Sequence, residues 1–172
     1  EITFRIVRTA PYVQHRSSEI ARKMIADKKA GGAAAGNRKK TEPKDHEAAY
    51  QSAFHRFEDG SGYGIPASSF RNALISACRV TGLVMTRAKL SIFITPDGFD
   101  DDGYPLVRIH GDPVKHESSV RLDSGGTDIR YRPMWKQWFC DVKVKFDRGQ
   151  FDASDIANLL AHAGQQVGVG EG

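Results

Sequence analysis

The sequence predicts an α+β fold of the ferredoxin-like class, in which one antiparallel sheet carries its helices on one face. Short stretches that alternate apolar and polar residues are typical of half-buried strands, and two longer stretches carry apolar residues at helical spacing. These stretches follow one another as strand, helix, strand, one or more strands, strand and helix, which is the order of the split βαβ arrangement. We expect a single domain over residues 1–172, with an insertion at about residues 16–62.

The expected strands are recognised by their period of two. Residues 2–7, 90–95 and 106–110 alternate in this way, and a long extended stretch after residue 128 is interrupted at Pro133. The apolar side of each strand is expected to face the core. The opposite face is expected to be free, and it carries cationic side chains and aromatic rings: Arg5, Phe93, Arg108, His110, Phe139, Lys143 and Lys145.

Two amphipathic helices are expected to cover the sheet. The first begins after Pro66 and ends at Gly82, and the second begins with a cap at residues 152–154 and ends before Gly164. Beyond the glycine-rich end we expect a further strand, and we expect both natural ends to extend past this chain. The apolar stripes consist of Phe70, Ala73, Leu74, Ala77 and Cys78 in the first helix and of Ile156, Leu159, Leu160 and Ala163 in the second.

The insertion is expected to contain two further helical stretches, over residues 17–29 and 47–57, joined by a loop at residues 30–45. The loop is rich in glycine and alanine and then becomes basic, so we expect it to be flexible. Its cations Arg38, Lys39 and Lys40 are expected either to be solvated or to close over a nucleic-acid backbone.

The composition is ordinary for a globular protein, with 40% apolar and 27% charged residues, and the net charge of +4 gives a mild preference for anionic partners. Cys78 and Cys140 lack the spacing of a metal site and lie on apolar faces, which indicates reduced core residues of a cytoplasmic protein. No run of about 18 apolar residues is present, so we expect no membrane-spanning segment and no membrane partner.

The start of the helix after Pro66 is the strongest candidate site. Its first turn has free backbone N–H groups and the positive end of the helix dipole, to which Ser68 and Ser69 add hydroxyls and Arg71 adds a fixed charge. This combination is typical of a phosphate-binding site. Proline and serine also occur at ordinary helix starts, so a purely structural cap is the alternative.

The other motifs identify no catalytic or metal-binding residue. The acidic loop at residues 97–103 lacks the oxygen ligands that a calcium-binding loop needs at its first and twelfth positions. The histidines lack the HxxxH and HExxH spacings, and no nucleophile motif is present. We therefore expect no metal and no cofactor. The absence of motifs does not exclude an enzyme, but we favour a protein without catalytic activity.

The segment GIPASSFRNAL, at residues 64–74, resembles the Ile-Pro-x-Ser-Ser-hydrophobic-Arg-x-Ala motif of the repeat-associated mysterious protein superfamily, which includes the backbone subunits of CRISPR effector complexes. The last helix and the VGVGEG that follows it are similar to the glycine-rich loop of that superfamily. Ala67 and Asn72 depart from the residues that are usual in the motif. The whole chain also resembles uncharacterised proteins of phages and prophages.

The resemblance implies an RRM-like core that binds single-stranded RNA along its backbone. It further implies copies of the chain arranged side by side in a filament, in the cytoplasm of a bacterial host cell. Phosphate contacts are implied for the serine pair and Arg71, and the glycine-rich loop would line the path of the strand. With the basic residues, the expected nucleic-acid contacts are Ser68, Ser69, Arg71, Arg38, Lys39, Lys40, Lys143, Lys145, Gly168, Gly170 and Gly172.

The first functional hypothesis is a non-catalytic protein that binds single-stranded RNA or DNA. One alternative is a metal-dependent ribonuclease that uses Asp97 or Asp101, and the other is a protein-interaction module that mimics a CRISPR subunit. Salt-dependent binding of an unstructured oligonucleotide favours the first hypothesis. Cleavage that depends on magnesium favours the second, and a tight protein complex without affinity for nucleic acid favours the third.

Overall fold

The computed structural model describes residues 1–16, 45–121 and 125–170. Within these ranges the chain forms a mixed α+β structure with four helices and three small antiparallel sheets of three strands each. The prediction of an α+β fold is confirmed, but the strands that were expected in one sheet are divided among three. The helix expected over residues 17–29 and all but the last residue of the loop expected over residues 30–45 lie outside the described residues.

The sheet that carries the main core consists of β1 (Ile2–Val7), β9 (Phe139–Phe146) and β4 (Ile92–Thr95), in the order β1-β9-β4. Both pairings are antiparallel. The alternation of β9 places Cys140, Val142 and Val144 on a fully buried face, and the residues between them lie on the more exposed face. We call that exposed face, opposite the core, the open face.

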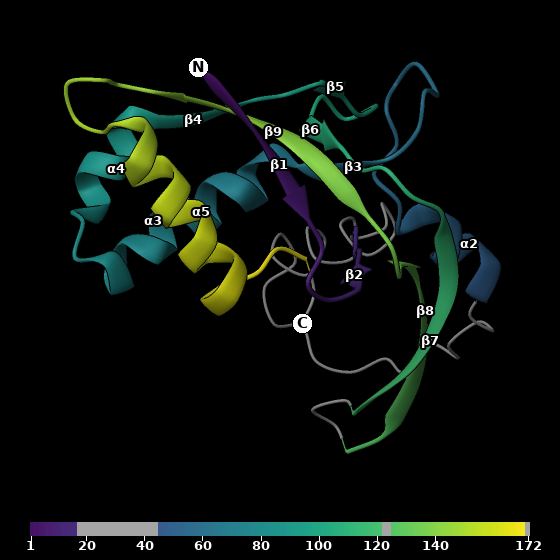
Figure 1. Ribbon diagram of the computed structural model, residues 1–172. Coiled ribbons are helices and arrows are strands. Elements are labelled where there is room, and N and C mark those ends of the chain that lie inside the picture. The colour runs from purple at the N-terminus through teal and green to yellow at the C-terminus, as the bar shows by residue number, and fades with distance from the viewer. Residues whose placement is uncertain (17–44, 122–124, 171–172) are drawn as a thin grey trace, which may run out of the picture.

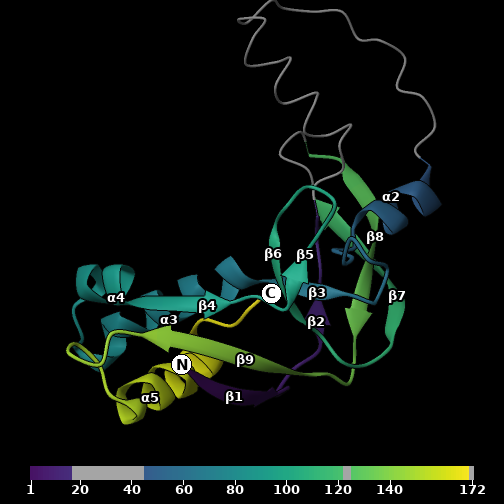
Figure 2. The ribbon, with the colours of Figure 1, turned by 90° about the horizontal axis from the view of Figure 1, so that it is seen from above.

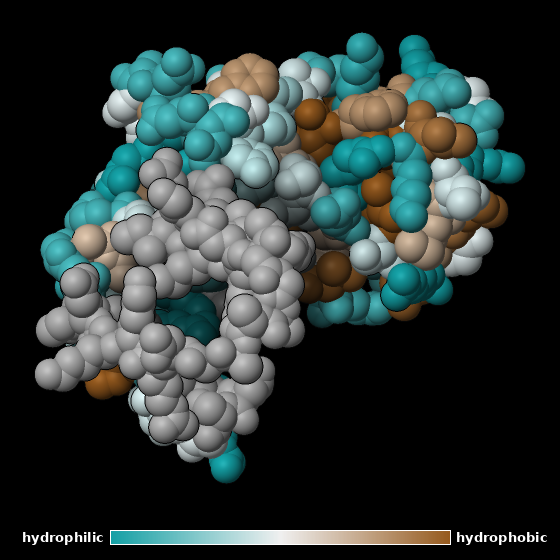
Figure 3. Space-filling view, turned by 180° about the vertical axis from the view of Figure 1, so that it is seen from behind, coloured by the Kyte–Doolittle hydropathy of each residue, from teal (hydrophilic) through white to brown (hydrophobic). Residues whose placement is uncertain are grey.

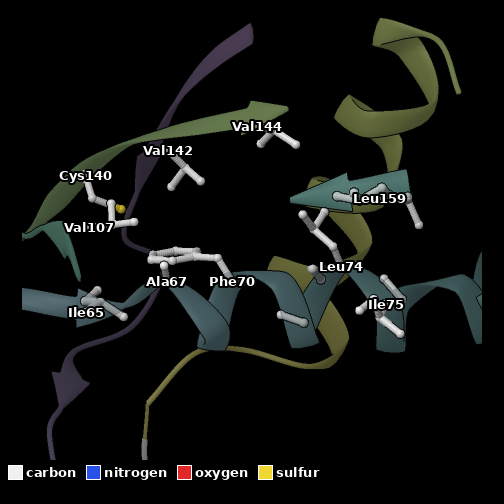
Figure 4. Close-up of a cluster of buried hydrophobic side chains, with 14 of the residues drawn as sticks. Ile65, Ala67, Phe70, Leu74, Ile75, Val107, Cys140, Val142, Val144 and Leu159 are labelled. Atoms are coloured by element: carbon white, nitrogen blue, oxygen red, sulfur yellow. The ribbon is translucent and has the colours of Figure 1, made fainter. Parts of the chain in front are cut away.

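Two helices cover the buried face of this sheet. They are α3 (Ala67–Thr81) and α5 (Ala153–Gln166), and the buried side chains of both belong to one core with the buried residues of β9. Phe70 and Leu74 point from α3 toward β9 (Figure 4). Gly82 ends α3 with a left-handed φ of 73°, as the sequence predicted. The two apolar stripes inferred from helical spacing therefore form the centre of the fold.

The two smaller sheets lie beside the main one. One contains β2 (Tyr12–Val13), β8 (Thr127–Trp135) and β7 (Pro113–Arg121), and the helix α2 (His46–Ser52) packs on β8. The other contains β3 (Gly64–Pro66), β6 (Pro105–Arg108) and β5 (Gly98–Phe99). The β7–β8 hairpin and the helices α3, α4 and α5 lie at opposite ends of the molecule (Figure 1, Figure 2).

Several boundaries differ from the sequence-based expectation. The strand expected over residues 90–95 begins only at Ile92, and Ile92 and Ile94 face the core. Leu90 belongs instead to the helix α4 (Met85–Ser91), where its side chain is 80% exposed. The helix expected over residues 47–57 ends at Ser52. Pro133 does not interrupt the extended stretch but lies inside β8. Pro133 lies opposite Gln14, and its carbonyl accepts a hydrogen bond from the backbone N–H of Gln14. Gln14 is one residue past the end of β2, so the N–H that proline lacks is not needed for the pairing of β2 with β8.

The division into three sheets also divides the set of side chains that were expected on one free face. Arg108 lies on β6, in a different sheet from Arg5 and Lys143. His110 forms an isolated bridge with Phe139 and stacks on that ring, so it still reaches the open face. The remaining members, on β1, β4 and β9, share the open face as predicted.

Both cysteines are free and buried in the core, as their apolar surroundings predicted. Burial raises the pKa of the Cys140 thiol to about 12. None of the described helices combines the length and the apolar character that a membrane crossing requires. On the part of the surface that is not grey in Figure 3, exposed apolar side chains are interspersed with hydrophilic ones.

The role of α3 in the core gives a direct stability prediction. Leu74 of α3 is fully buried and points toward β9, so Leu74→Ala is expected to lower the free energy of unfolding by about 2–5 kcal/mol. Leu90→Ala removes the same atoms from an exposed position in a helix and is expected to change it by no more than about 0.5 kcal/mol. Urea denaturation measures both values. Equal effects of the two variants would contradict the assignment of α3 as the central core helix.

Candidate functional site

A cavity of about 270 Å³ lies at the start of α3. The residues that line it come from four separate parts of the chain: Tyr12, Gln14, His15, His55, Pro66, Ser69 and Gly170. We call this hollow the α3 cavity. It brings Ser69 and Gly170, two of the residues predicted from the sequence to contact nucleic acid, to the same place.

The backbone at the start of α3 is held in place by β3. Gly64 pairs with Arg108 of β6, and a Cβ at Gly64 would lie 2.7 Å from the Cβ of Leu106, so only glycine fits this close approach. Pro66 occupies the N-cap position, where no side chain caps the helix. The hydroxyl of Ser69 makes no hydrogen bond to another described residue. The first turn of α3 therefore keeps backbone donors and a hydroxyl for a ligand.

The buried amide of Gln14 connects the segments that form the wall of the α3 cavity. Its Nε2 donates to the hydroxyl of Tyr12 at 3.1 Å and to the carbonyl of Gly64 at 2.8 Å. Its Oε1 accepts from the backbone N–H of His55 at 2.9 Å. Burial raises the pKa of Tyr12, which keeps its phenol protonated. One side chain thus fixes β2, the strand before α3 and the segment after α2 relative to one another.

A buried carboxylate holds one of the two histidines of the cavity. Asp100 accepts from the backbone N–H groups of Asp102 and Tyr104 at 3.0 and 2.9 Å, and its Oδ2 lies 3.1 Å from Nδ1 of His55. Arg16 lies 3.8 Å from the same carboxylate oxygen. A carboxylate in this position fixes the orientation of an imidazole ring. The side chain of His55 is only 12% exposed, so the ring is part of the cavity wall.

The glycine-rich end of the chain approaches the α3 cavity closely. Gly170 has a φ of 96°, and a Cβ there would lie 2.5 Å from the ring of Tyr12 and 3.0 Å from the carbonyl oxygen of Val13. Gly168 also has a left-handed φ of 75° but faces open space. It lines a neighbouring hollow of about 180 Å³ between β1, α3 and α5. The glycine at position 170 is therefore required by its close packing against Tyr12 and Val13.

Arg71 does not line the α3 cavity. Its Nε donates to the carbonyl of Ile92 at 3.0 Å, and its Nη2 donates to the carbonyl of Lys89 at 2.5 Å. Arg71 therefore does not join Ser69 at one phosphate site, as the sequence-based interpretation expected. The physical reason is helix geometry, because Ser69 and Arg71 are two positions apart and so lie on nearly opposite sides of a helix with 3.6 residues per turn.

The remaining predicted residues are placed as follows. Ser68 is exposed in the first turn of α3 and does not line the cavity. Lys143 lies on the open face, where Asp97 at 2.7 Å raises the pKa of its ammonium group. Lys145 is exposed on the same face and makes no ion pair within the described part of the chain. The other predicted contacts, Arg38, Lys39, Lys40 and Gly172, lie outside the described residues.

No geometry for a metal ion is found among the described residues, where no three histidine, cysteine or acidic side chains are grouped to hold one. Asp97, named in the ribonuclease alternative, binds Lys143 with one carboxylate oxygen and the backbone N–H of Arg108 with the other. Asp101 is exposed in the turn between β5 and β6.

Sequence reasoning missed Gln14, His15, His55 and Asp100 as residues in or behind the cavity wall. No spacing between these residues indicates a site, because they meet only when β2, the segment after α2 and the β5–β6 turn come together in the fold.

Comparison with protein-family models, with curated proteins and with solved structures gives no match for this chain.

The position of Arg71 predicts a structural effect of its removal. Arg71→Ala leaves two carbonyl groups without their charged donor, and the guanidinium is partly exposed, so we expect a loss of about 1–2 kcal/mol in the free energy of unfolding. Arg79→Ala, at an exposed position of the same helix, is the matched control and should cost no more than about 0.5 kcal/mol. Chemical denaturation compares them, and an Arg71 variant as stable as the Arg79 variant would refute this structural role.

Proposed function

We propose that the protein binds single-stranded nucleic acid, RNA in the first place, through its phosphate backbone, and that one phosphate occupies the α3 cavity. The observation that carries the proposal is the meeting of Ser69 and Gly170 at an uncapped helix start. The backbone donors of the first turn of α3 and the hydroxyl of Ser69 suit an anion. The packing of Gly170 against Tyr12 and Val13 holds the backbone of the glycine-rich segment at the wall of the cavity.

The charges around the α3 cavity support an anionic ligand. None of the residues that line it is acidic, and two are histidines. The carboxylate of Asp100 is buried, contacts His55 at 3.1 Å without lining the cavity, and accepts hydrogen bonds from two backbone groups. The positive end of the α3 dipole is therefore not cancelled by an acidic side chain in the lining.

The arrangement of the main sheet supports the more specific part of the proposal. The order β1-β9-β4, with α3 and α5 on one face, agrees with three strands of a ferredoxin-like sheet. We propose on this basis, and on the motif at residues 64–74, that the chain is related to the repeat-associated mysterious protein superfamily. Assembly of copies along the strand and a location in the bacterial cytoplasm, with a phage or prophage origin, belong to the same proposal.

The test introduces a negative charge that stabilises the helix start but repels an anionic ligand. Ser69→Asp places a carboxylate in the first turn of α3, where the helix dipole stabilises it, so the protein should remain as stable as the wild type. The same carboxylate repels phosphate in the α3 cavity. We expect the affinity for a fluorescein-labelled oligouridine to fall by about tenfold or more, equivalent to about 1.4 kcal/mol, in fluorescence anisotropy.

Ser154→Asp is the matched control, because it adds the same charge in the first turn of α5. The end of α5, rather than its start, lies beside the start of α3, since both line the same hollow. Equal affinities of the Ser69 and Ser154 variants would reject the α3 cavity as the binding site.

The affinity of the wild-type protein should also fall between about 50 and 200 mM salt, with log K decreasing by about 0.7 per phosphate contact for each tenfold increase in salt. Oligodeoxythymidine of the same length tests the preference for RNA.

A further inference from the structure

The open face of the main sheet carries a half-exposed aromatic side chain. Phe93 of β4 points away from the core and is 47% exposed, while Ile92 and Ile94 on either side of it face the helices. A half-exposed phenylalanine on a solvent-facing strand leaves apolar area in water without any contribution to the core. The ring is therefore accessible to a ligand from the solvent side.

Arg71 fixes Phe93 from the side of the helical layer. The guanidinium carbon lies 5.3 Å from the centre of the phenylalanine ring, and the two carbonyl contacts of Arg71 hold the guanidinium group in place. A ring that is held in this way loses little conformational freedom when a flat ligand stacks on it. The residue that sequence reasoning assigned to phosphate thus supports an aromatic surface.

The neighbours of Phe93 on the open face are cationic. Lys145 of β9 is directly opposite Phe93 in the strand register, and Lys143 lies two residues further along β9. At the other end of the same face, Phe139 is stacked with His110 at 4.5 Å and lies 4.9 Å from the guanidinium carbon of Arg5. Phe139 and Lys145 are six residues apart on β9, which corresponds to about 20 Å along the strand.

The charge of the open face favours one class of ligand. Of its acidic groups, Asp141 is bound to Arg5 at 2.8 Å and Asp97 to Lys143 at 2.7 Å, and Glu1 accepts a hydrogen bond from the hydroxyl of Thr95. Lys145 makes no ion pair among the described residues and lies directly opposite Phe93, so a positive charge is available beside the exposed ring. Aromatic rings with cations between them match a single strand, whose bases have π faces and whose backbone has negative charges.

We propose that the open face is a second contact surface for single-stranded nucleic acid, on which an unpaired base stacks on Phe93 while Lys145 contacts a neighbouring phosphate. This inference rests on the proposed function and extends it from phosphate binding to base stacking. Bases in a duplex are already stacked on one another, so the surface selects single strands over double strands. Stacking on a ring accepts every base, so it adds affinity without sequence preference.

The test compares two phenylalanines with similar exposure. Phe93→Leu removes the aromatic face, and Phe99→Leu makes the same change on β5, where the ring is 52% exposed in another sheet. We expect Phe93→Leu to weaken binding of a labelled twelve-nucleotide oligouridine by about fivefold or more. Phe99→Leu should bind like the wild type, and Phe93→Trp should restore binding. Thermal denaturation checks that the variants fold.

An abasic oligonucleotide of the same length separates stacking from phosphate contacts. On this probe the Phe93→Leu variant should bind as the wild type does, because no base is present, while Ser69→Asp should still weaken binding. An affinity for oligouridine that Phe93→Leu leaves unchanged would overturn the stacking surface and leave the α3 cavity intact. The stacking surface would also be overturned if Phe93→Leu weakened binding of the abasic oligonucleotide and of an RNA duplex as much as it weakens binding of oligouridine. If the wild type binds no oligonucleotide, this inference falls together with the proposed function.

Discussion

The packing of α3 against the main sheet is the constraint on which the rest of the structure depends. Its buried stripe forms one core with β9 and packs on α5 and β4, and its first residue follows directly on β3, which is paired with β6. Ile65 and Leu74 are both fully buried, so the helix cannot slide or rotate without opening the core. The start of α3 is therefore a rigid point at the junction of two sheets, and a rigid backbone is what a preorganised anion site requires.

The same helix connects the two surfaces that we assign to nucleic acid. Ser69 lines the α3 cavity, while Arg71 lies on the opposite side of the helix and contacts Phe93 near the start of β4. A displacement of α3 would thus disturb the cavity and the open face together. In this account one face of the main sheet provides the core that fixes the phosphate site, and the other face provides an aromatic surface with unpaired positive charge.

The sequence predicted those features that depend on neighbouring residues. The stripes of α3 and α5 and the end of α3 at Gly82 follow from local spacing and from the backbone freedom of glycine. The division into three sheets depends on pairings such as that of Gly64 with Arg108, which no local pattern contains. The wall of the α3 cavity depends on such long-range contacts as well, so Gln14 and His55 were missed. The contacts of Arg71 were missed for the same reason, because its partners are the carbonyls of Lys89 in α4 and Ile92 in β4.

The most direct test of the central claim, that a single strand is bound at the start of α3, is photo-crosslinking of the wild-type protein to an oligonucleotide that contains 4-thiouridine at every position. Mass spectrometry then locates the crosslinked residues. The account predicts crosslinks in residues 64–71 and in the segment around Phe93, both of which should disappear as the salt concentration is raised, because phosphate contacts hold the strand in place. Crosslinks confined to other segments, such as the β7–β8 hairpin, would contradict it.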